Sequence, residues 1–332
     1  MIMEINGIGN NMNDVYYINE LGYSKGYHKF DLHRLPQAYI EYFPWITISW
    51  DEVDIIPNGS IIFVQTPCND EANKLSKLLS IIDNHTVFIN QESNIFDWFD
   101  WDASTQQLYI ECLSKCKAFC YHSEHDKKVM EVFISNFILY PGCTNIIADN
   151  FKQFNSGDYI VIPNPIKRYQ RGMISHKIAS DNIKNIPIYA MAYHRPSTNE
   201  LLAFPDAYKL PNIELKNRMG LNEWFGFIYN SKFGIDIHRE FSGGNCSLEF
   251  GALGVPLIGN INLDTQRNIF PDLSFEYNDY KNIKNGVHLL LNDSDFYNEV
   301  SKKALINIKE KYNSKLIVEQ FKQDIINIIK QN

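Results

Sequence analysis

The sequence predicts an α/β protein built from two doubly wound domains, each with a parallel sheet between layers of helices. Three observations predict this class. Short runs rich in β-branched and aromatic residues alternate with helix-length segments, which is typical of parallel strands joined by crossover helices. The pattern restarts after Pro163-Asn164-Pro165, where two prolines indicate a junction between domains. The length of 332 residues suffices for two domains of roughly 150 residues each.

Before this junction the expected strands cover residues 1–6, 60–65, 86–90, 118–121 and 159–162, and a Gly/Asn turn over 7–10 follows the first of them. Helices are expected over 13–21, 71–82, 105–113 and 124–133. After the junction, strands are expected over 186–193, 233–238 and 255–259, and helices over 199–209 and 247–253. The stretch 314–329 predicts one amphipathic closing helix, because apolar side chains recur in it at helical spacing. These side chains are Leu316, Val318, Phe321, Ile325, Ile326 and Ile329.

Composition argues against several classes of protein. Hydrophobic residues make up 45% of the chain and charged residues 21%, as in a globular protein with a core. The apolar runs are too short to span a bilayer, and the amino-terminal sequence lacks the pattern of a secretory signal, so we expect a cytoplasmic protein. The cysteines Cys112, Cys116 and Cys120 show no CxxC and no matched histidine pair. This spacing favours buried thiols over a disulfide framework or a metal site.

Charge is distributed unevenly along the chain. Residues 1–165 carry a net charge of -11, whereas residues 166–332 carry +3. A mildly basic half suits a phosphate-bearing ligand, and an acidic half is a poor surface for a polyanion.

The segment 241–260 contains the residues best suited to chemistry. Gly243 and Gly244 free the backbone for close approach to a ligand, and a helix is expected to begin directly after them. The N–H groups and positive dipole end of such a helix suit a diphosphate. Glu249, placed in the first turn, could accept hydrogen bonds from two ribose hydroxyls. The alternative is an ordinary strand–loop–helix–strand unit in which Glu249 only favours the helix N-terminus.

Residues 248–258, Leu-Glu-Phe-Gly-Ala-Leu-Gly-Val-Pro-Leu-Ile, resemble the carboxyl-terminal donor motif of retaining GT-B glycosyltransferases. In that family the stretch reads roughly Leu-Glu-Ala-Met-Ala-x-Gly-x-Pro-Val-Ile. The resemblance implies that Glu249 holds the donor ribose. It also implies that the preceding loop lines the diphosphate and the sugar; its residues are Gly243, Gly244, Asn245, Cys246 and Ser247. The family's earlier glutamate would fall on Phe241, which leaves the neighbouring Glu240 as the candidate for its role.

The resemblance carries further expectations. It implies two Rossmann-like domains facing a central cleft, with residues 1–165 on the acceptor side and 166–313 binding the nucleotide sugar. The helix in 314–332 would pack back on the first domain. A UDP-sugar is the expected co-substrate, transferred with retention of configuration, and neither a permanently bound cofactor nor an essential metal is expected.

Three more residues are expected at the donor. Family members place a phosphate-binding arginine at a strand end, and Arg195 follows the predicted strand 186–193; a surface salt bridge is the alternative. Lys209 and Arg218 are fallback partners for the phosphate. Gly7 and Gly9 resemble the glycine turn after the first strand in these enzymes.

Two strand ends resemble those of phage enzymes that glucosylate hydroxymethylcytosine in DNA. Gln91 and Glu92 follow the predicted strand 86–90, and His122 follows the strand 118–121. The resemblance implies catalytic roles for these three residues. For His122 and the nearby His125, a role at a strand end or helix cap is the alternative.

Trp98 and Trp101 stand among three aspartates, and aromatic faces beside carboxylates suit the binding of an acceptor sugar. The alternative places both indoles on the buried face of a helix start. Aromatic rings also stack on nucleic-acid bases, although carboxylates repel nearby phosphates.

The sequence therefore predicts a glycosyltransferase whose acceptor is a hydroxymethylated pyrimidine in DNA, with a saccharide as the alternative. DNA would require a basic rim within the acidic half, formed by Lys25, Lys29, Arg34, Lys127 and Lys128. A non-catalytic nucleotide-sugar-binding protein, and an epimerase or phosphorylase of the same architecture, are the remaining alternatives.

Overall fold

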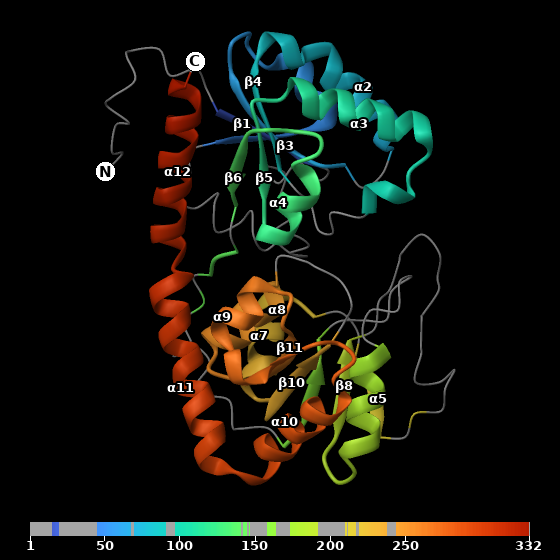
Figure 1. Ribbon diagram of the computed structural model, residues 1–332, viewed down its shortest axis with the longest axis vertical. Coiled ribbons are helices and arrows are strands. Elements are labelled where there is room, and N and C mark those ends of the chain that lie inside the picture. The colour runs from blue at the N-terminus through green and yellow to red at the C-terminus, as the bar shows by residue number, and fades with distance from the viewer. Residues whose placement is uncertain are drawn as a thin grey trace. The chain divides into compact units, whose positions relative to one another are not determined.

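The computed structural model describes residues 15–19, 45–67, 70–90, 97–140, 142–144, 146, 158–163, 173–191, 210, 212–216, 219–237 and 244–331. The chain divides into two compact units (Figure 1). The first unit comprises Met1–His28, Ile40–Tyr140 and Val318–Asn332, and the second comprises Lys29–Tyr39 and Pro141–Ile317. Within the described ranges, none of the helices combines the length and apolar character needed to cross a bilayer.

The first unit contains a parallel sheet of six described strands in the order β2-β1-β3-β4-β5-β6. The strands are β1 (Val15–Asn19), β2 (Ile46–Ser49), β3 (Ile61–Gln65), β4 (Thr86–Asn90), β5 (Ala118–Tyr121) and β6 (Phe137–Leu139). The helices are η3 (Trp50–Ile55), α2 (Glu71–Ile81), η4 (Ile82–Asn84), η5 (Asp97–Asp100), α3 (Ala103–Lys115) and α4 (Glu124–Met130). Each α-helix of this set connects two parallel strands, as the alternating pattern predicts.

The helix predicted over residues 13–21 is wrong, because Val15–Asn19 forms strand β1. This strand lies inside the sheet, hydrogen-bonded to β2 on one side and to β3 on the other. Its sequence explains the outcome. Tyr16, Tyr17 and Ile18 are all buried, and aromatic and β-branched residues suit a strand covered on both faces. The strand and turn predicted over residues 1–10 lie outside the described residues.

The two faces of the first sheet are covered differently. Helices α2 and α3 cover one face, where Leu75, Leu78 and Leu113 are each at most 1% exposed. The opposite face carries aromatic rings: Phe63 stacks on Phe88 with centroids 4.9 Å apart. Phe321, from the carboxyl-terminal segment, covers Phe63 at 5.8 Å.

The second unit contains a parallel sheet of six described strands in the order β12-β11-β10-β7-β8-β9. Its strands are β7 (Ile160–Ile162), β8 (Ile188–Met191), β9 (Ile213–Lys216), β10 (Phe233–Asp236), β11 (Leu257–Asn260) and β12 (Ser274–Phe275). Its helices are α5 (Met173–Asn182), α7 (Leu221–Tyr229), α8 (Asn245–Ala252), α9 (Asp264–Ile269), η7 (Pro271–Leu273), α10 (Tyr280–Asn292) and α11 (Ser294–Lys311). When the strands are numbered from β7 as 1 to β12 as 6, their order across the sheet from β9 to β12 is 3-2-1-4-5-6. This is the order of a dinucleotide-binding Rossmann sheet. The order reverses between β7 and β10.

Strand β7 joins the second sheet, whereas the sequence analysis placed its residues before the junction at 163–165. It pairs with β8 on one side and β10 on the other. Pro163 directly follows this strand and lacks the N–H that would continue the ladder. The proline therefore ends a strand of the second sheet at this point.

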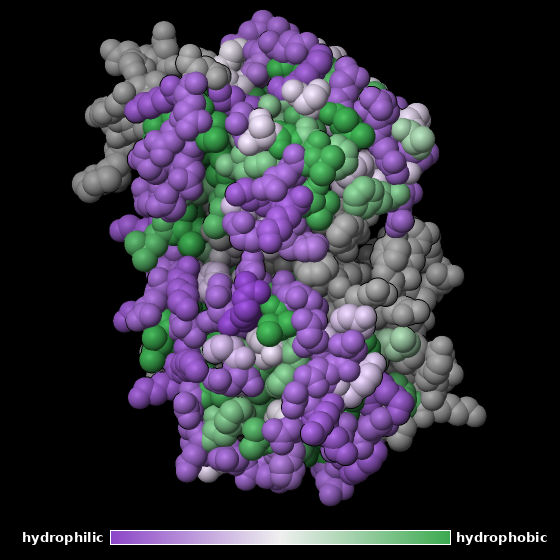
Figure 2. Space-filling view, in the orientation of Figure 1, coloured by the Kyte–Doolittle hydropathy of each residue, from purple (hydrophilic) through white to green (hydrophobic). Residues whose placement is uncertain are grey.

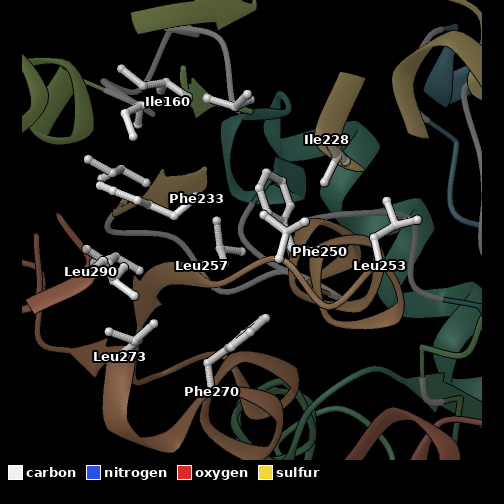
Figure 3. Packing of buried hydrophobic residues seen from close by; sticks show 14 of the residues in the cluster. Ile160, Ile228, Phe233, Phe250, Leu253, Leu257, Phe270, Leu273 and Leu290 are labelled. Carbon is white, nitrogen blue, oxygen red and sulfur yellow. The ribbon is translucent and has the colours of Figure 1, made fainter. Parts of the chain in front are cut away.

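The core of the second unit lies between the sheet and its helices (Figure 3). Phe233 and Leu257 from neighbouring strands are fully buried, as is Phe250 from α8. Phe270, just after α9, is 1% exposed and belongs to the same cluster. Helix α8 is therefore held against the sheet by its own apolar side chains.

The long helix α12 (Ser314–Lys330) follows α11 and covers the whole of the helix predicted over 314–329, with one further residue. Val318, Phe321 and Ile325 are buried, as their spacing predicts, whereas Leu316 is 62% exposed. In Figure 2 the outer surfaces of α11 and α12 are largely hydrophilic. One side of α12 thus packs on the protein while the other faces solvent.

Candidate functional site

The reversal of strand order between β7 and β10 is the place where Rossmann sheets bind ligands, at the carboxyl ends of the strands. Here Ser175, on the first turn of α5, ties that helix to the end of β10. Its hydroxyl accepts a hydrogen bond from the Ile237 N–H at 2.8 Å and donates to the Ile237 carbonyl at 3.0 Å. Ser175 and Ile237 are fully buried. The two elements on either side of the reversal are therefore fixed to each other.

Helix α8 begins on Gly244, after β10. Gly244 has a left-handed φ of 66°, and a Cβ at this position would come within 1.7 Å of the Thr265 hydroxyl oxygen. Leu248 donates its N–H to the Gly244 carbonyl at 3.3 Å and closes the first turn. Both the backbone conformation and the space thus require glycine at this start. A glycine also has no side chain with which to cap the helix.

Two helices that follow strands of the first sheet, α3 and α4, carry side-chain caps, whereas α2 does not. The Asp102 carboxylate accepts from the N–H groups of Ser104 and Thr105 at the start of α3. Ser123 accepts from the Asp126 N–H at the start of α4. The N-cap of α8, Gly244, makes no side-chain cap hydrogen bond. The positive dipole end of this helix suits an anion such as a diphosphate.

A second layer of contacts supports the start of α8. The Ser247 hydroxyl donates to the Gln266 side-chain carbonyl at 2.8 Å, and the Gln266 amide donates to the Leu257 carbonyl at 2.8 Å. Gln266 lies directly over Gly259, where a Cβ would be 2.4 Å from the Gln266 Cδ. Ser247 is 1% exposed. Its hydroxyl is thus used inside the unit, whereas the sequence analysis placed Ser247 in the loop that lines the donor.

Glu249 lies on the second turn of α8, one residue beyond the first turn in which the sequence analysis placed it. It is 3% exposed, and its Oε2 accepts a hydrogen bond from the Trp224 indole N–H at 2.8 Å. Trp224 belongs to α7 and is 4% exposed. Sequence reasoning missed Trp224, because the pair is separated by 25 residues and only the packing of α7 on α8 brings the two together.

The remaining predicted donor residues divide into two groups. Asn245 and Cys246 lie on the first turn of α8 and are partly buried. The others lie outside the described residues: Gly7, Gly9, Arg195, Glu240 and Gly243, with the fallback residues Lys209 and Arg218. Their donor roles stay predictions.

At the carboxyl edge of the first sheet, His122 directly follows β5. Its Nδ1 lies 2.8 Å from the Tyr140 backbone carbonyl oxygen. A carbonyl oxygen only accepts hydrogen bonds, so Nδ1 carries the proton in this contact, and the ring orientation is fixed. Gln91 and Glu92, predicted to act beside His122, lie outside the described residues. The catalytic roles of all three stay predictions.

Trp98 lies in the core of the first unit, 4% exposed, with its ring stacked on Phe99 and edge-on to Phe133. Trp101 is partly buried against Tyr109, with centroids 5.5 Å apart. This placement favours the alternative interpretation, in which the indoles pack at a helix start. Both indoles pack against Tyr109 of α3, since Trp98 lies 5.5 Å from the same ring.

Among the described cysteines, Cys112, Cys120 and Cys143 are buried thiols, whereas Cys116 and Cys246 are partly exposed. Desolvation raises the pKa of Cys112 and of Cys143 to about 12. Within the described ranges, His, Cys, Asp and Glu form no cluster of three or more that could hold a metal. Of the basic rim proposed for DNA, Lys25, Lys29 and Arg34 lie outside the described residues. Lys127 lies on α4, with its ammonium 5.9 Å from the centroid of the Tyr121 ring.

Comparison with solved structures identifies the fold. Sucrose-phosphate synthase from Thermosynechococcus elongatus matches with a TM-score of 0.67 and 12% identity, covering 96% of this chain and all of the other. The α,α-trehalose 6-phosphate synthase from Burkholderia multivorans matches with a TM-score of 0.66 and 9% identity, covering 90% of this chain and 75% of the other. Together with the two parallel sheets, these matches decide the fold. The chain has the GT-B fold.

A third GT-B structure was solved with ligands. TarM from S. aureus, in complex with fondaparinux, α-GlcNAc-glycerol and UDP, matches with a TM-score of 0.64 and 14% identity. The match covers 89% of this chain and 58% of TarM, so the chain spans less than two thirds of that protein. No protein-family model matches the sequence, and no curated protein matches it at a significant level. The GT-B fold predicted from the donor-motif resemblance is confirmed.

Proposed function

We propose that this chain is a glycosyltransferase that moves a sugar from a UDP-sugar to a hydroxyl group of a saccharide acceptor. One observation carries the proposal: α8 starts on an uncapped glycine after the strand at which the order of a Rossmann sheet reverses. That position and that helix start suit a diphosphate. GT-B proteins of similar structure support the choice of ligand, since TarM was solved with UDP.

In this reaction the acceptor oxygen forms a bond to the anomeric carbon, and the bond from that carbon to the diphosphate breaks. The acceptor proton passes to a base, and the nucleoside diphosphate leaves. The protein must place the acceptor and stabilise the charge that develops on the departing phosphate. We assign the phosphate to the first turn of α8 and to Arg195, and the ribose to Glu249. His122 and Glu92 are the proposed proton acceptors.

Glu249 suits ribose binding because the indole of Trp224 already holds one carboxylate oxygen. The hydrogen bond from Trp224 restricts the rotation of the carboxylate before a ligand arrives. A carboxylate oriented in this way loses little side-chain entropy on binding.

A saccharide acceptor is favoured over hydroxymethylated DNA. The net charge of -11 over residues 1–165 opposes a polyanion, because DNA affinity rests largely on the neutralisation of phosphates. The ligands named for TarM are fondaparinux, α-GlcNAc-glycerol and UDP, and none of the three is DNA. A neutral saccharide requires no basic groove in the acidic half of the chain.

Two measurements test the proposal. The first is a thermal-shift screen with UDP-, GDP-, ADP- and TDP-sugars, in which a ligand at 100 times its Kd stabilises the fold by about 2.7 kcal/mol. The second follows release of the nucleoside diphosphate and transfer of labelled sugar to glycans, unmodified DNA and DNA carrying hydroxymethylcytosine or hydroxymethyluracil. Stabilisation by a UDP-sugar with transfer to glycans is expected. Binding without hydrolysis or transfer would identify a sensor, and labelling of modified DNA alone would overturn the saccharide acceptor.

A further inference from the structure

Asn90 is the last residue of β4, at the carboxyl edge of the first sheet. Thr66 holds its backbone: the Asn90 carbonyl accepts from the Thr66 N–H at 3.0 Å and from the Thr66 hydroxyl at 2.9 Å. The same hydroxyl lies 3.1 Å from the Tyr109 hydroxyl, which extends the contact to α3. The direction in which the Asn90 side chain leaves the strand is therefore fixed.

The side-chain amide of Asn90 is in an unusual state. Asn90 is 1% exposed, and among the residues that the structure describes neither its Oδ1 nor its Nδ2 has a hydrogen-bond partner. Buried polar groups in folded proteins are nearly always paired, because an unmade hydrogen bond leaves the cost of desolvation uncompensated. The amide of Asn230 differs in that one half is paired. Its Oδ1 has no partner among the described residues, but its Nδ2 donates to the Gly226 carbonyl. In Asn90 neither half of the amide has a partner among the described residues.

Neighbouring strands place further neutral polar groups beside this amide. Gln65 is the register partner of Asn90 on β3, 4% exposed, and the two side chains leave the sheet on the same face. That face is the one on which Phe63 stacks on Phe88, two residues earlier in each strand. On the other side Asn90 pairs with Cys120 of β5, two residues before His122. The Gln65 Oε1 accepts a hydrogen bond from the Tyr17 hydroxyl at 3.5 Å. The carboxyl edge thus carries two uncharged carboxamides on one face, and His122 follows the strand beside them.

This chemistry selects a class of ligand. A carboxamide offers one acceptor and one donor side by side, and a sugar hydroxyl likewise both donates and accepts. A phosphate or carboxylate would use only the donor half and leave Oδ1 without a partner. We infer that the Asn90 amide, with Gln65 beside it, forms a subsite for the hydroxyl groups of a neutral sugar. This inference rests on the proposed function and assigns the neutral saccharide to a named position in the first unit.

The test compares the parent protein with Asn90→Leu, which replaces the amide by an apolar group of similar shape. The control is Asn268→Leu, because the Asn268 amide has a partner, the Tyr312 hydroxyl at 2.9 Å in the second unit. Thermal unfolding is measured alone, with UDP, and with UDP plus millimolar glucose, N-acetylglucosamine or glycerol. Release of UDP from UDP-glucose is measured at rising saccharide concentration.

We expect Asn90→Leu to unfold at the same temperature as the parent or higher, because no hydrogen bond is lost within the protein. Its response to UDP should be unchanged, its response to saccharide should disappear, and saccharide-dependent UDP release should fall at least about tenfold, the effect of losing one good hydrogen bond. Asn268→Leu should keep the saccharide response.

Three results would overturn the inference: no saccharide response in the parent, an equal response in parent and Asn90→Leu, or a lower melting temperature of Asn90→Leu with its saccharide response intact. The last would show an amide held by water for structural reasons. The UDP arm separates these results from failure of the proposed function. A parent that neither binds nor hydrolyses any nucleotide sugar removes the proposed function, whereas the results above remove only the subsite.

Discussion

The carboxyl edges of the two sheets are organised in opposite ways. In the second unit the polar side chains are braced by other parts of the protein: Ser247 by Gln266, and Glu249 by Trp224. In the first unit side chains cap the starts of α3 and α4, yet the Asn90 amide in the sheet itself has no partner among the described residues. In the second unit these polar side chains are held by contacts within the protein, whereas in the first unit the buried Asn90 amide has no such contact among the described residues.

The largest effect is expected from Gly244→Ala, which alters the start of α8 in the second unit. A left-handed φ costs a residue other than glycine roughly 1–2 kcal/mol, and overpacking against Thr265 adds roughly 1–3 kcal/mol. Thermal unfolding should show a large loss of stability, and calorimetry should show loss of UDP binding. Adding Thr265→Ala removes the 1.7 Å clash and should recover part of the stability. If Gly244→Ala matched the parent in both measurements, the start of α8 would not depend on this glycine.

A medium effect is expected from Trp224→Phe, which keeps the aromatic ring but removes the indole N–H. Loss of a hydrogen bond to a buried charged group should cost about 1.5–3 kcal/mol of the free energy of unfolding, measured by urea denaturation. Affinity for UDP should fall more than affinity for 2′-deoxy-UDP, since Glu249 is assigned to the ribose hydroxyls. Glu249→Gln is the matched variant, because it changes the acceptor of the same Trp224–Glu249 hydrogen bond. Equal losses for the two nucleotides would mean that Trp224 acts only on stability.

The smallest effect is expected at the capped edge, from Asp102→Asn. Hydrogen bonds from the Ser104 and Thr105 side chains, followed by the Thr105 N–H, hold the pKa of Asp102 well below its usual range. The ionised cap therefore contributes stability above the unfolded carboxyl pKa of about 3.9, and this contribution is lost as the pH falls toward the folded value. The melting temperature of Asp102→Asn should lie below that of the parent at pH 7, and the difference should shrink below about pH 4. A difference that stayed constant between pH 7 and pH 3 would contradict the assignment of the cap.

The sequence predicted best the elements whose signals are local. Helix α8 and the strand after it are predicted by a glycine turn, a short apolar run and a proline. Helix α12 is predicted by the helical spacing of its apolar residues. Strand β1 was mistaken for a helix because Val15-Tyr16-Tyr17-Ile18 is too short a run for periodicity to separate strand from helix; its burial between β2 and β3 decided the outcome.

The site was harder to predict because its contacts join distant parts of the chain. Nothing near Glu249 in the sequence points to Trp224, and nothing near Asn90 shows that its amide would be buried without a partner. Trp98 was expected at an acceptor sugar and lies in the core, since a single tryptophan has the same local signal in either place. Local pattern predicts where a helix begins, but only tertiary packing decides which side chains a ligand can reach.

Helix α12 has a consequence for the order in which the protein is made. The first unit is completed by the last residues of the chain, Val318–Asn332, and Phe321 from this segment covers Phe63 and Tyr140. Phe63 and Tyr140 are translated well before Phe321. The sheet of the first unit therefore keeps this aromatic face uncovered until the segment after Ile317 has been made. A chain released before Val318 would expose that face and become a substrate for chaperones and proteases.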